Sequence, residues 1–311
     1  MIVISEFMDE EAIRSGLDGF EVLYDPSLVD RPDDLAVVIG QADALIVRNR
    51  TQVRGALLEA ARHLKAVGRL GVGLDNIDVA ACKARGIAVY PASGANDTSV
   101  AEYVIATAML LLRGAYGASA EVASGAWPRN AVIGREIAGK RLGLIGFGAI
   151  ARETAKRAAA LGMTIAAYDP YLPPSAEAWT QPWGHVEPQP LNTLLAEADV
   201  VSLHVPLTDE TRGLIDGAAI SRMKKGALVI NAARGGVVDE GAIAAALRAG
   251  HLGGAALDVF EEEPLTAGLG SVFASTPNLI LTPHIAGVTV ESNVRVSWVT
   301  VDNIRRHLAG A

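Results

Sequence analysis

The chain has 311 residues, of which 50% are hydrophobic and 20% are charged. This composition is typical of a soluble α/β protein with a large core and excludes a disordered chain. With 27 basic and 35 acidic residues the formal net charge is −8, so neither nucleic acid nor an anionic membrane is an expected partner. The single cysteine, Cys82, excludes an internal disulfide and a cysteine metal cluster, and we expect no metal site.

The N-terminal segment, MIVISEF, favours a first strand over a signal peptide, because it has no basic region and only a brief apolar run. The longest apolar stretch, residues 104–112, is too short to span a bilayer. The sequence therefore predicts a cytoplasmic protein.

Short apolar runs return about every 22 residues in the first part of the chain, at 2–4, 21–24, 44–47, 64–67 and 87–90. Helix-like segments lie between these runs. Strands that alternate with helices form a parallel sheet, because the helix supplies the crossover that parallel neighbours need. The pattern predicts a small doubly wound domain, and its strand ends carry Arg48, Arg50 and the run Gly71, Val72, Gly73.

Residues 140–169 form the strongest motif of the chain: a strand, a glycine turn, a helix and a second strand that ends at Asp169. Gly146 allows the turn, and Gly148 lets backbone N–H groups approach a pyrophosphate at the helix N-terminus. Asp169 stands where a carboxylate binds the adenosine ribose and repels a 2′-phosphate, so NAD is favoured over NADP. The predicted cofactor-binding residues of this motif are Gly146, Phe147, Gly148, Ala149, Ile150, Asp169 and Pro170.

A long helix is predicted at residues 98–116, apolar nearly all round, so it must be buried between the domains, against another subunit, or both. This implies a homodimer, with the irregular residues 124–139 as a connecting arm. Residues 170–190 hold six of the fourteen prolines and predict a surface loop. Further strands are expected at 199–205, 227–231, 254–259 and 279–281, and further helices at 191–198, 241–249 and 290–308.

The predicted fold class is α/β, with two doubly wound parallel-sheet (Rossmann-like) domains and a cleft between them. We expect the chain to cross between the domains twice, near residues 91–96 and 283–288, so that the last helix packs on the first domain. Residues 1–95 plus 288–311 are then a flavodoxin-like substrate-binding domain. Residues 96–287 are an NAD-binding Rossmann domain.

Four polar stretches stand at the later strand ends: HVP at 204–206, NAARGG at 231–236, DVFEEEP at 258–264 and PHIAG at 283–287. The ends of parallel strands meet in one crevice, so an arginine, a carboxylate and a histidine come together there. Reversible oxidation of a 2-hydroxy acid needs these groups. Histidine takes the hydroxyl proton, a carboxylate orients it, and arginine binds the substrate carboxylate with two parallel bonds.

These motifs are together similar to those of the D-isomer-specific 2-hydroxyacid dehydrogenase family, which includes phosphoglycerate, glycerate and D-lactate dehydrogenases. The resemblance covers nearly the whole chain, through GREIAGKRLGLIGFGAIA, HVPLTDETRGLI, NAARGGVVDE, ALDVFEEEP and TPHIAG. It implies that Arg234 binds the substrate, that His284 is the acid/base and that Glu263 is its partner. The glutamine of formate dehydrogenases is replaced here by Glu263, which argues against that chemistry.

The resemblance also extends the two binding sites. Asp258 would contact the nicotinamide amide, while Arg48 and the Gly71–Gly73 backbone would contact the substrate. Further cofactor-binding residues are His204, Val205, Pro206, Thr211, Asn231, Ala232, Ala233, Asp258, Ala286 and Gly287. The predicted substrate-binding residues are Arg48, Arg50, Gly71, Val72, Gly73 and Arg234.

The sequence defines the type of reaction better than it defines the substrate. Arg48 and Arg50 stand two apart, and in extended backbone such residues point the same way, so both could bind a second anion. Alternatively, Arg48 supports the Gly71–Gly73 turn and Arg50 is solvated. The segments ISEFMDE and VRNRTQV are similar to those of sulfolactate dehydrogenases.

We therefore expect 3-sulfolactate or 3-phosphoglycerate as the substrate. A glyoxylate/hydroxypyruvate or D-lactate reductase of the same family is the alternative. An NAD-sensing, corepressor-like binding protein is the alternative of another class.

Overall fold

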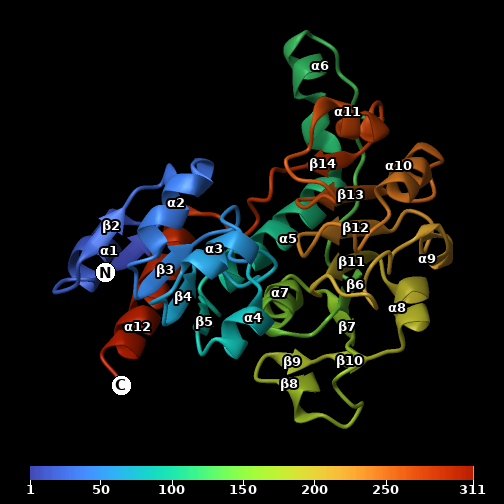
Figure 1. Cartoon of the computed structure of the whole chain (residues 1–311). Coiled ribbons are helices and arrows are strands. Elements are labelled where there is room, and N and C mark those ends of the chain that lie inside the picture. The colour runs from blue at the N-terminus through green and yellow to red at the C-terminus, as the bar shows by residue number, and fades with distance from the viewer. Residues whose placement is uncertain (311) are drawn as a thin grey trace. The chain divides into compact units, whose positions relative to one another are not determined.

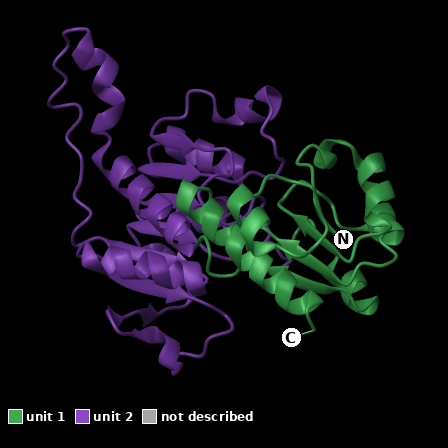
Figure 2. Ribbon diagram, turned by 90° about the vertical axis from the view of Figure 1, so that its left-hand side faces the viewer, with its two compact units in different colours: residues 1–96, 288–311 green, residues 97–287 purple. Residues whose placement is uncertain are grey.

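The computed structural model describes residues 1–310, and they divide into two compact units. Unit 1 comprises residues 1–96 and the C-terminal segment from Val288, and unit 2 comprises residues 97–287 (Figure 2). Both are α/β units built on a parallel sheet (Figure 1), as the alternation of apolar runs and helical segments predicts.

Unit 1 contains a five-stranded sheet in the order β2-β1-β3-β4-β5, in which all neighbours are parallel. Its strands are β1 (Ile2–Ile4), β2 (Val22–Tyr24), β3 (Ala44–Val47), β4 (Ala66–Arg69) and β5 (Ala88–Pro91). Its helices are α1 (Glu10–Gly16), α2 (Pro32–Ile39), α3 (Gly55–Ala60), α4 (Val79–Ala84) and α12 (Val290–Leu308), with the 3-10 helix η1 (Leu28–Asp30).

The last helix, α12, belongs to unit 1 and covers one face of its sheet. Its N-terminus is closed by a capping box, in which Thr289 and Ser292 each accept the other's backbone N–H. Gly68 of β4 leaves the space that Thr300 and Ile304 of α12 fill, since a side chain there would overlap both. The amphipathic helix expected at 290–308 therefore packs on the first strands of the chain.

Unit 2 contains a seven-stranded parallel sheet in the order β10-β7-β6-β11-β12-β13-β14. Its strands are β6 (Arg141–Ile145), β7 (Thr164–Tyr168), β10 (Glu187–Pro188), β11 (Val200–Leu203), β12 (Leu228–Asn231), β13 (Gly254–Leu257) and β14 (Leu279–Leu281). Its helices are α5 (Asp97–Arg113), α6 (Ser119–Ala123), α7 (Ala149–Ala160), α8 (Leu191–Glu197), α9 (Gly217–Arg222), α10 (Glu240–Arg248) and α11 (Ala267–Gly270). The 3-10 helices are η2 (Ala115–Ala118), η3 (Glu177–Trp179) and η4 (Ser271–Phe273).

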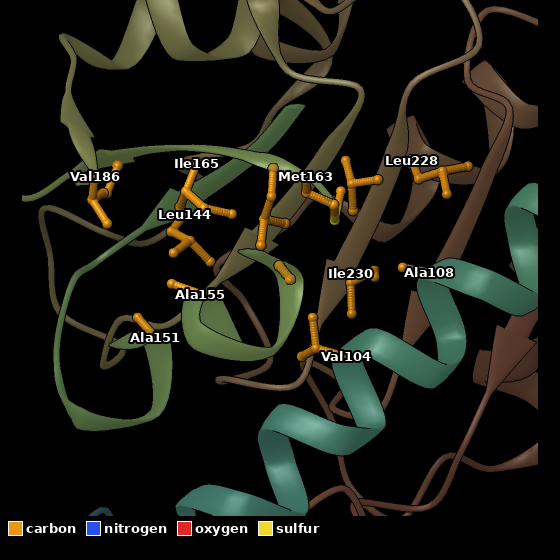
Figure 3. Close-up of a cluster of buried hydrophobic side chains, with 14 of the residues drawn as sticks. Val104, Ala108, Leu144, Ala151, Ala155, Met163, Ile165, Val186, Leu228 and Ile230 are labelled. Atoms are coloured by element: carbon orange, nitrogen blue, oxygen red, sulfur yellow. The ribbon is translucent and has the colours of Figure 1, made fainter. Parts of the chain in front are cut away.

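Both faces of this sheet are buried, because alternate residues of its central strands enter different core clusters. Leu228 and Ile230 of β12 belong to one cluster and Val229 belongs to the other. Val104 and Ala108 of α5 face Ile230 in the first cluster (Figure 3). Strands buried on both faces carry continuous apolar runs, which is why the sequence pattern located them.

The fourth strand is Ala66–Arg69 and not the expected 64–67, and two longer segments also differ from the sequence prediction. The long helix ends at Arg113, before the expected residue 116, because Gly114 takes a left-handed φ of 61° and turns the chain into η2. The proline-rich segment 170–190 is not wholly a loop. It contains the hairpin β8 (Thr180–Gln181) and β9 (Gly184–His185), and β10, whose Pro188 is tolerated because β10 is an edge strand.

No single helix among residues 1–310 is long and apolar enough to cross a membrane. The bent pair formed by the helices Asp97–Arg113 and Ala115–Ala123 reaches the length and apolar composition of a membrane span only when the two helices are taken together.

Candidate active site

The predicted site residues of unit 2 lie at one edge of its sheet, because the strands that precede them are parallel neighbours. Five consecutive strands of the sheet, β6, β11, β12, β13 and β14, end in the glycine turn, His204, Asn231, Asp258 and the His284 segment respectively. Gly146 and His284, the first and last of these residues, are more than a hundred positions apart in the sequence. The order of the strands in the sheet brings the whole set to one edge.

His284 and Glu263 form a direct pair, with His284 Nδ1 2.8 Å from Glu263 Oε2. The other carboxylate oxygen, Oε1, accepts the backbone N–H of Phe260 at 3.0 Å, which fixes the carboxylate plane. Burial would raise the pKa of Glu263. The hydrogen bond and charge of His284, the Phe260 N–H and the charge of Arg234 outweigh burial and lower that pKa. An ionised carboxylate is thus kept against the imidazole.

Arg234 stands in a loop that Asn231 shapes. The buried Asn231 side chain accepts the N–H of Ala233 at 3.1 Å and donates to the carbonyl of Arg234 at 2.9 Å. The guanidinium lies close enough to Glu263 for its charge to lower the pKa of that carboxyl. Histidine, carboxylate and arginine are therefore gathered at one place.

Asp258 is almost fully buried, with 1% of its surface exposed. Its Oδ1 accepts hydrogen bonds from Thr282 Oγ1 at 2.6 Å and Ile285 N at 2.8 Å, and its Oδ2 accepts one from Ala286 N at 2.8 Å. These bonds hold the segment on either side of His284. The predicted contact of Asp258 with the nicotinamide amide remains a prediction.

The glycine turn after β6 fits a bound dinucleotide. Gly146 has a φ of 87°, and a side chain there would overlap the carbonyl of His204. Around Gly148 the space is open, and this N-cap residue offers no side chain to the first N–H groups of α7. Exposed N–H groups at a helix N-terminus bind phosphate, so Ala149 and Ile150 stand where the motif predicts a pyrophosphate.

Asp169 closes this turn as well as standing at the end of β7. Its Oδ2 accepts the backbone N–H of Phe147 and its Oδ1 that of Tyr171, both at 2.9 Å. Phe147 differs from the expectation of direct cofactor binding, since its side chain is buried in the core and its N–H is bonded to Asp169. Exposed Pro170 follows Asp169 directly.

The strand end after β11 carries further predicted cofactor residues. His204 Nε2 lies 2.9 Å from Ser202 Oγ, and burial lowers the pKa of His204 to about 4, so this imidazole is neutral near pH 7. Thr211 Oγ1 donates to the carbonyl of Pro206 at 2.6 Å and accepts the N–H of Thr208 at 2.8 Å. The hydroxyl thus shapes the loop. Val205, Ala232, Ala233, Ala286 and Gly287 lie beside these strand ends.

In unit 1, Arg48 and Arg50 follow β3, and their side chains have different partners. The Arg48 guanidinium bonds to Asn293 of α12 and lies over the Phe7 ring, 5.7 Å from its centroid. Arg50 forms an exposed ion pair with Asp30. The two guanidiniums therefore have different partners in this structure, and the binding of substrate by both stays a prediction.

The turn after β4 holds Gly71, Val72 and Gly73, and Val72 is exposed. Gly71 has a φ of 146°, and a side chain there would overlap the guanidinium of Arg69. A glycine is therefore required at this position.

Sequence reasoning missed the side chains that support these loops. Buried Glu6 accepts the backbone N–H groups of Arg48, Arg50 and Thr51 at 2.9, 3.2 and 3.0 Å. Asn76 donates to the carbonyl of Thr51 at 2.7 Å. Glu6 comes two residues after the end of the buried strand β1, and this position was the only signal for its role in the sequence.

Among residues 1–310, no group of three or more His, Cys, Asp or Glu side chains is placed to hold a metal ion.

Comparison with known proteins identifies the family. Residues 105–286 match the model of the D-isomer specific 2-hydroxyacid dehydrogenase, NAD binding domain. The (S)-sulfolactate dehydrogenase of Chromohalobacter salexigens is 56% identical over 99% of this chain and 98% of its own length. The hydroxypyruvate reductase of Thermotoga maritima is 39% identical over 98% of this chain and 97% of its own length.

A solved structure agrees with these matches. The D-lactate dehydrogenase of Aquifex aeolicus, complexed with NAD and lactic acid, superposes with a TM-score of 0.85 and 28% identity, over 100% of this chain and 96% of that one. The chain therefore belongs to the D-isomer specific 2-hydroxyacid dehydrogenase family and is an NAD-dependent oxidoreductase of 2-hydroxy acids.

Proposed function

We propose that this enzyme interconverts 3-sulfolactate and sulfopyruvate, with NAD as the partner in hydride transfer. The observation that carries the substrate is the 56% identity, over nearly both full lengths, to a (S)-sulfolactate dehydrogenase. The relatives named as hydroxypyruvate reductase and D-3-phosphoglycerate dehydrogenase are 38–42% identical. Phosphoglycerate remains the second candidate, because it shares the second anionic group.

The proton is handled by His284. Glu263 accepts a hydrogen bond from Nδ1, so in the neutral imidazole that nitrogen carries the proton and Nε2 carries the lone pair. Nε2 then takes the proton of the substrate hydroxyl during oxidation and returns it during reduction. Bound NAD supplies the hydride acceptor at the carbinol carbon.

The substrate carboxylate is bound by Arg234. A guanidinium makes two parallel charge-assisted bonds to a carboxylate, which fixes the 2-carbon against both His284 and the nicotinamide. Glu263 near Arg234 offsets part of its charge and stabilises the imidazolium that forms on His284.

Unit 1 is proposed to bind the substrate, and unit 2 to bind NAD. The sulfonate would be held by Arg50, with Arg48 and the Gly71–Gly73 backbone on the carboxylate end. The ion pair of Arg50 with Asp30 is exposed on both sides, and such pairs contribute only about 0–1 kcal/mol. Its release for a substrate anion therefore costs little.

We also infer a homodimer, located in the cytoplasm. Residues 109–133 carry exposed apolar side chains, at Met109, Leu110, Tyr116, Val122, Trp127 and Ile133. Figures 1 and 2 show α6 and the irregular segment after it extending away from the rest of unit 2. Exposed apolar patches of this kind mark association surfaces, and a second copy would cover them.

A panel of 2-oxo acids assayed for NADH oxidation tests the function. Sulfopyruvate should give the highest kcat/KM, above phosphohydroxypyruvate, hydroxypyruvate, glyoxylate and pyruvate. His284→Ala should lower kcat by about 10²–10⁴, the usual worth of a positioned acid/base. A higher kcat/KM with another acid rejects the substrate, and absence of any turnover favours an NAD-sensing binding protein.

A further inference from the structure

Tyr103 of α5 is joined to the His284 segment by a chain of short hydrogen bonds within unit 2. Its hydroxyl lies 2.6 Å from Thr282 Oγ1, and Thr282 Oγ1 lies 2.6 Å from Asp258 Oδ1. A carboxylate only accepts, so Thr282 donates to Asp258 and Tyr103 donates to Thr282. Burial raises the pKa of Tyr103 to about 12, opposed by the Thr282 bond and aided by the Asp258 charge. The phenol therefore keeps the proton it donates.

The chain of bonds ends on the backbone that surrounds His284. The Asp258 carboxylate accepts the N–H groups of Ile285 and Ala286, and the Asp258 carbonyl accepts that of His284 at 2.8 Å. His284 itself has a φ of 55°, in the left-handed region that residues with a side chain rarely adopt. Such a conformation persists only when its surroundings impose it, and here Asp258 accepts three consecutive backbone N–H groups while the carbonyl of Thr282 accepts that of His284 at 3.0 Å.

Strand β14, which leads into this segment, needs an anchor because it is the edge strand of the sheet. Its ladder hydrogen bonds run to β13 on one side, and α5 bonds to it at both ends. Tyr103 contacts Thr282 after the strand, and Asn278, before the strand, donates to the carbonyl of Leu111 at 3.2 Å. The buried face of α5 is fixed in the core of unit 2 (Figure 3), so the helix is a firm support.

We propose that Tyr103 is a positioning residue for the acid/base histidine. Its hydroxyl fixes Thr282, Thr282 fixes Asp258, and Asp258 holds His284 in the left-handed backbone conformation that presents Nε2 to the substrate. The role goes beyond the proposed substrate, because it applies to any 2-oxo acid that the enzyme reduces. It also differs from general stabilisation of the fold, which would leave the chemical step unchanged in folded molecules.

Tyr103→Phe removes the hydroxyl and keeps the ring. Tyr90→Phe is the matched control, because the Tyr90 hydroxyl makes a comparable 3.0 Å bond to His307 Nδ1 within unit 1. The rates are measured with the best 2-oxo acid of the panel, so failure of sulfopyruvate leaves the test intact. Each kcat is calculated per NADH-binding site, with the site concentration measured by NADH titration. Unfolded molecules, which do not bind NADH, therefore do not lower the measured kcat.

Tyr103→Phe should lower kcat about three- to tenfold, the worth of one neutral hydrogen bond. The KM of the 2-oxo acid and the Kd of NADH should stay within about twofold of wild type, and Tyr90→Phe should keep the wild-type kcat. An unchanged kcat with a lowered Tm would overturn the proposal. A kcat loss with a weaker Kd for NADH would also overturn it, because the hydroxyl would then act on cofactor binding.

Variants of Thr282 give a second, independent test. Thr282→Ser retains the bridging hydroxyl and should keep kcat within about twofold of wild type. Thr282→Val removes the hydroxyl, and its kcat should fall at least as far as that of Tyr103→Phe. In the Thr282→Val background, Tyr103→Phe should have no further effect, because its donor no longer has an acceptor that leads to Asp258. Full additivity of the two losses would contradict a shared path. If Thr282→Val does not fold, Tyr103→Phe and Thr282→Ser decide by the outcomes above.

Discussion

Arg48 and Arg50 leave the same strand end of unit 1 but are held by different partners, Asn293 for the first and Asp30 for the second. Their backbone is fixed by one buried carboxylate, that of Glu6, which accepts the N–H groups of both. The loop is thus firm while its two cations differ in accessibility. The Arg48 side chain is half-buried, and its burial lowers its pKa against the opposing charge of Glu6, whereas Arg50 is exposed.

The accessible Arg50 should set the preference for a second anion. Arg50→Ala should lower the ratio of kcat/KM for sulfopyruvate over pyruvate by about 10- to 100-fold, on the scale of a charged hydrogen bond. Asp30→Asn releases Arg50 and should keep or raise that ratio. Arg62→Ala, at another exposed position of unit 1, is the control. An unchanged ratio in Arg50→Ala would show that Arg50 is a solvated loop charge.

Glu263→Gln should move the pH profile of oxidation. The carboxylate stabilises the imidazolium of His284 and, in return, its own pKa is lowered despite burial. Glu263→Gln removes that charge from the coupled His284–Glu263 pair, so the acidic limb of kcat/KM for oxidation should shift to lower pH. Steady-state rates across pH 5–9 in constant ionic strength measure this shift. If the acidic limb of Glu263→Gln stays at the wild-type pH, the His284–Glu263 pair does not set that limb.

Asp169 should make NAD preferred over NADP. Because its carboxylate also accepts two backbone N–H groups, Asp169→Asn is a better variant than Asp169→Ala, since an amide oxygen retains one acceptor. The variant should reduce the preference for NAD by about 10- to 100-fold, the range of one charged hydrogen bond. The measurement is kcat/KM with both cofactors. Equal efficiency of the wild type with NAD and NADP would refute the prediction.

His204 should make the protein less stable in acid. Burial lowers its pKa from 6.5 to about 4 in the folded state, so between these values the unfolded chain binds a proton that the folded chain does not. The free energy of unfolding then falls as pH drops through this window, by about 3 kcal/mol at most from this group.

His204→Asn should remove this part of the pH dependence. Urea unfolding at pH 7.5 and 4.5 measures it, with His63→Asn as the control for loss of an exposed histidine. The variant should lose less stability than wild type between the two pH values. An equal loss would mean that His204 does not contribute.

The sequence predicts the strands and their ends well because each buried strand is a continuous apolar run that stops at glycine or a polar residue. Asp169, Asn231 and Asp258 could be located in this way, and parallel neighbours then bring their ends together. The same reasoning located the last helix, whose amphipathic spacing matches α12 from Val290 to Leu308.

Side-chain partners could not be predicted in the same way, because they depend on residues far apart in the sequence. Arg50 forms an ion pair with Asp30, 20 residues earlier in the chain, and Tyr103 forms a hydrogen bond with Thr282, 179 residues later. The sequence pattern also did not predict the backbone conformation at positions where a single residue determines it. The left-handed turn at Gly114 shortens α5, and no periodicity of apolar residues distinguishes that glycine from those within helices.

Unit 1 is assembled from both ends of the chain, and this affects its synthesis on the ribosome. The backbone of Asp9 bonds to Ser297 across 288 residues, and Gly68 leaves space for residues of α12. When the first 96 residues emerge, the helix that covers this face of their sheet has not been made. Unit 2 is contiguous, so we expect it to be complete first. Until α12 has been made, the nascent first domain exposes the apolar surface that this helix covers, and we expect a chaperone to bind there.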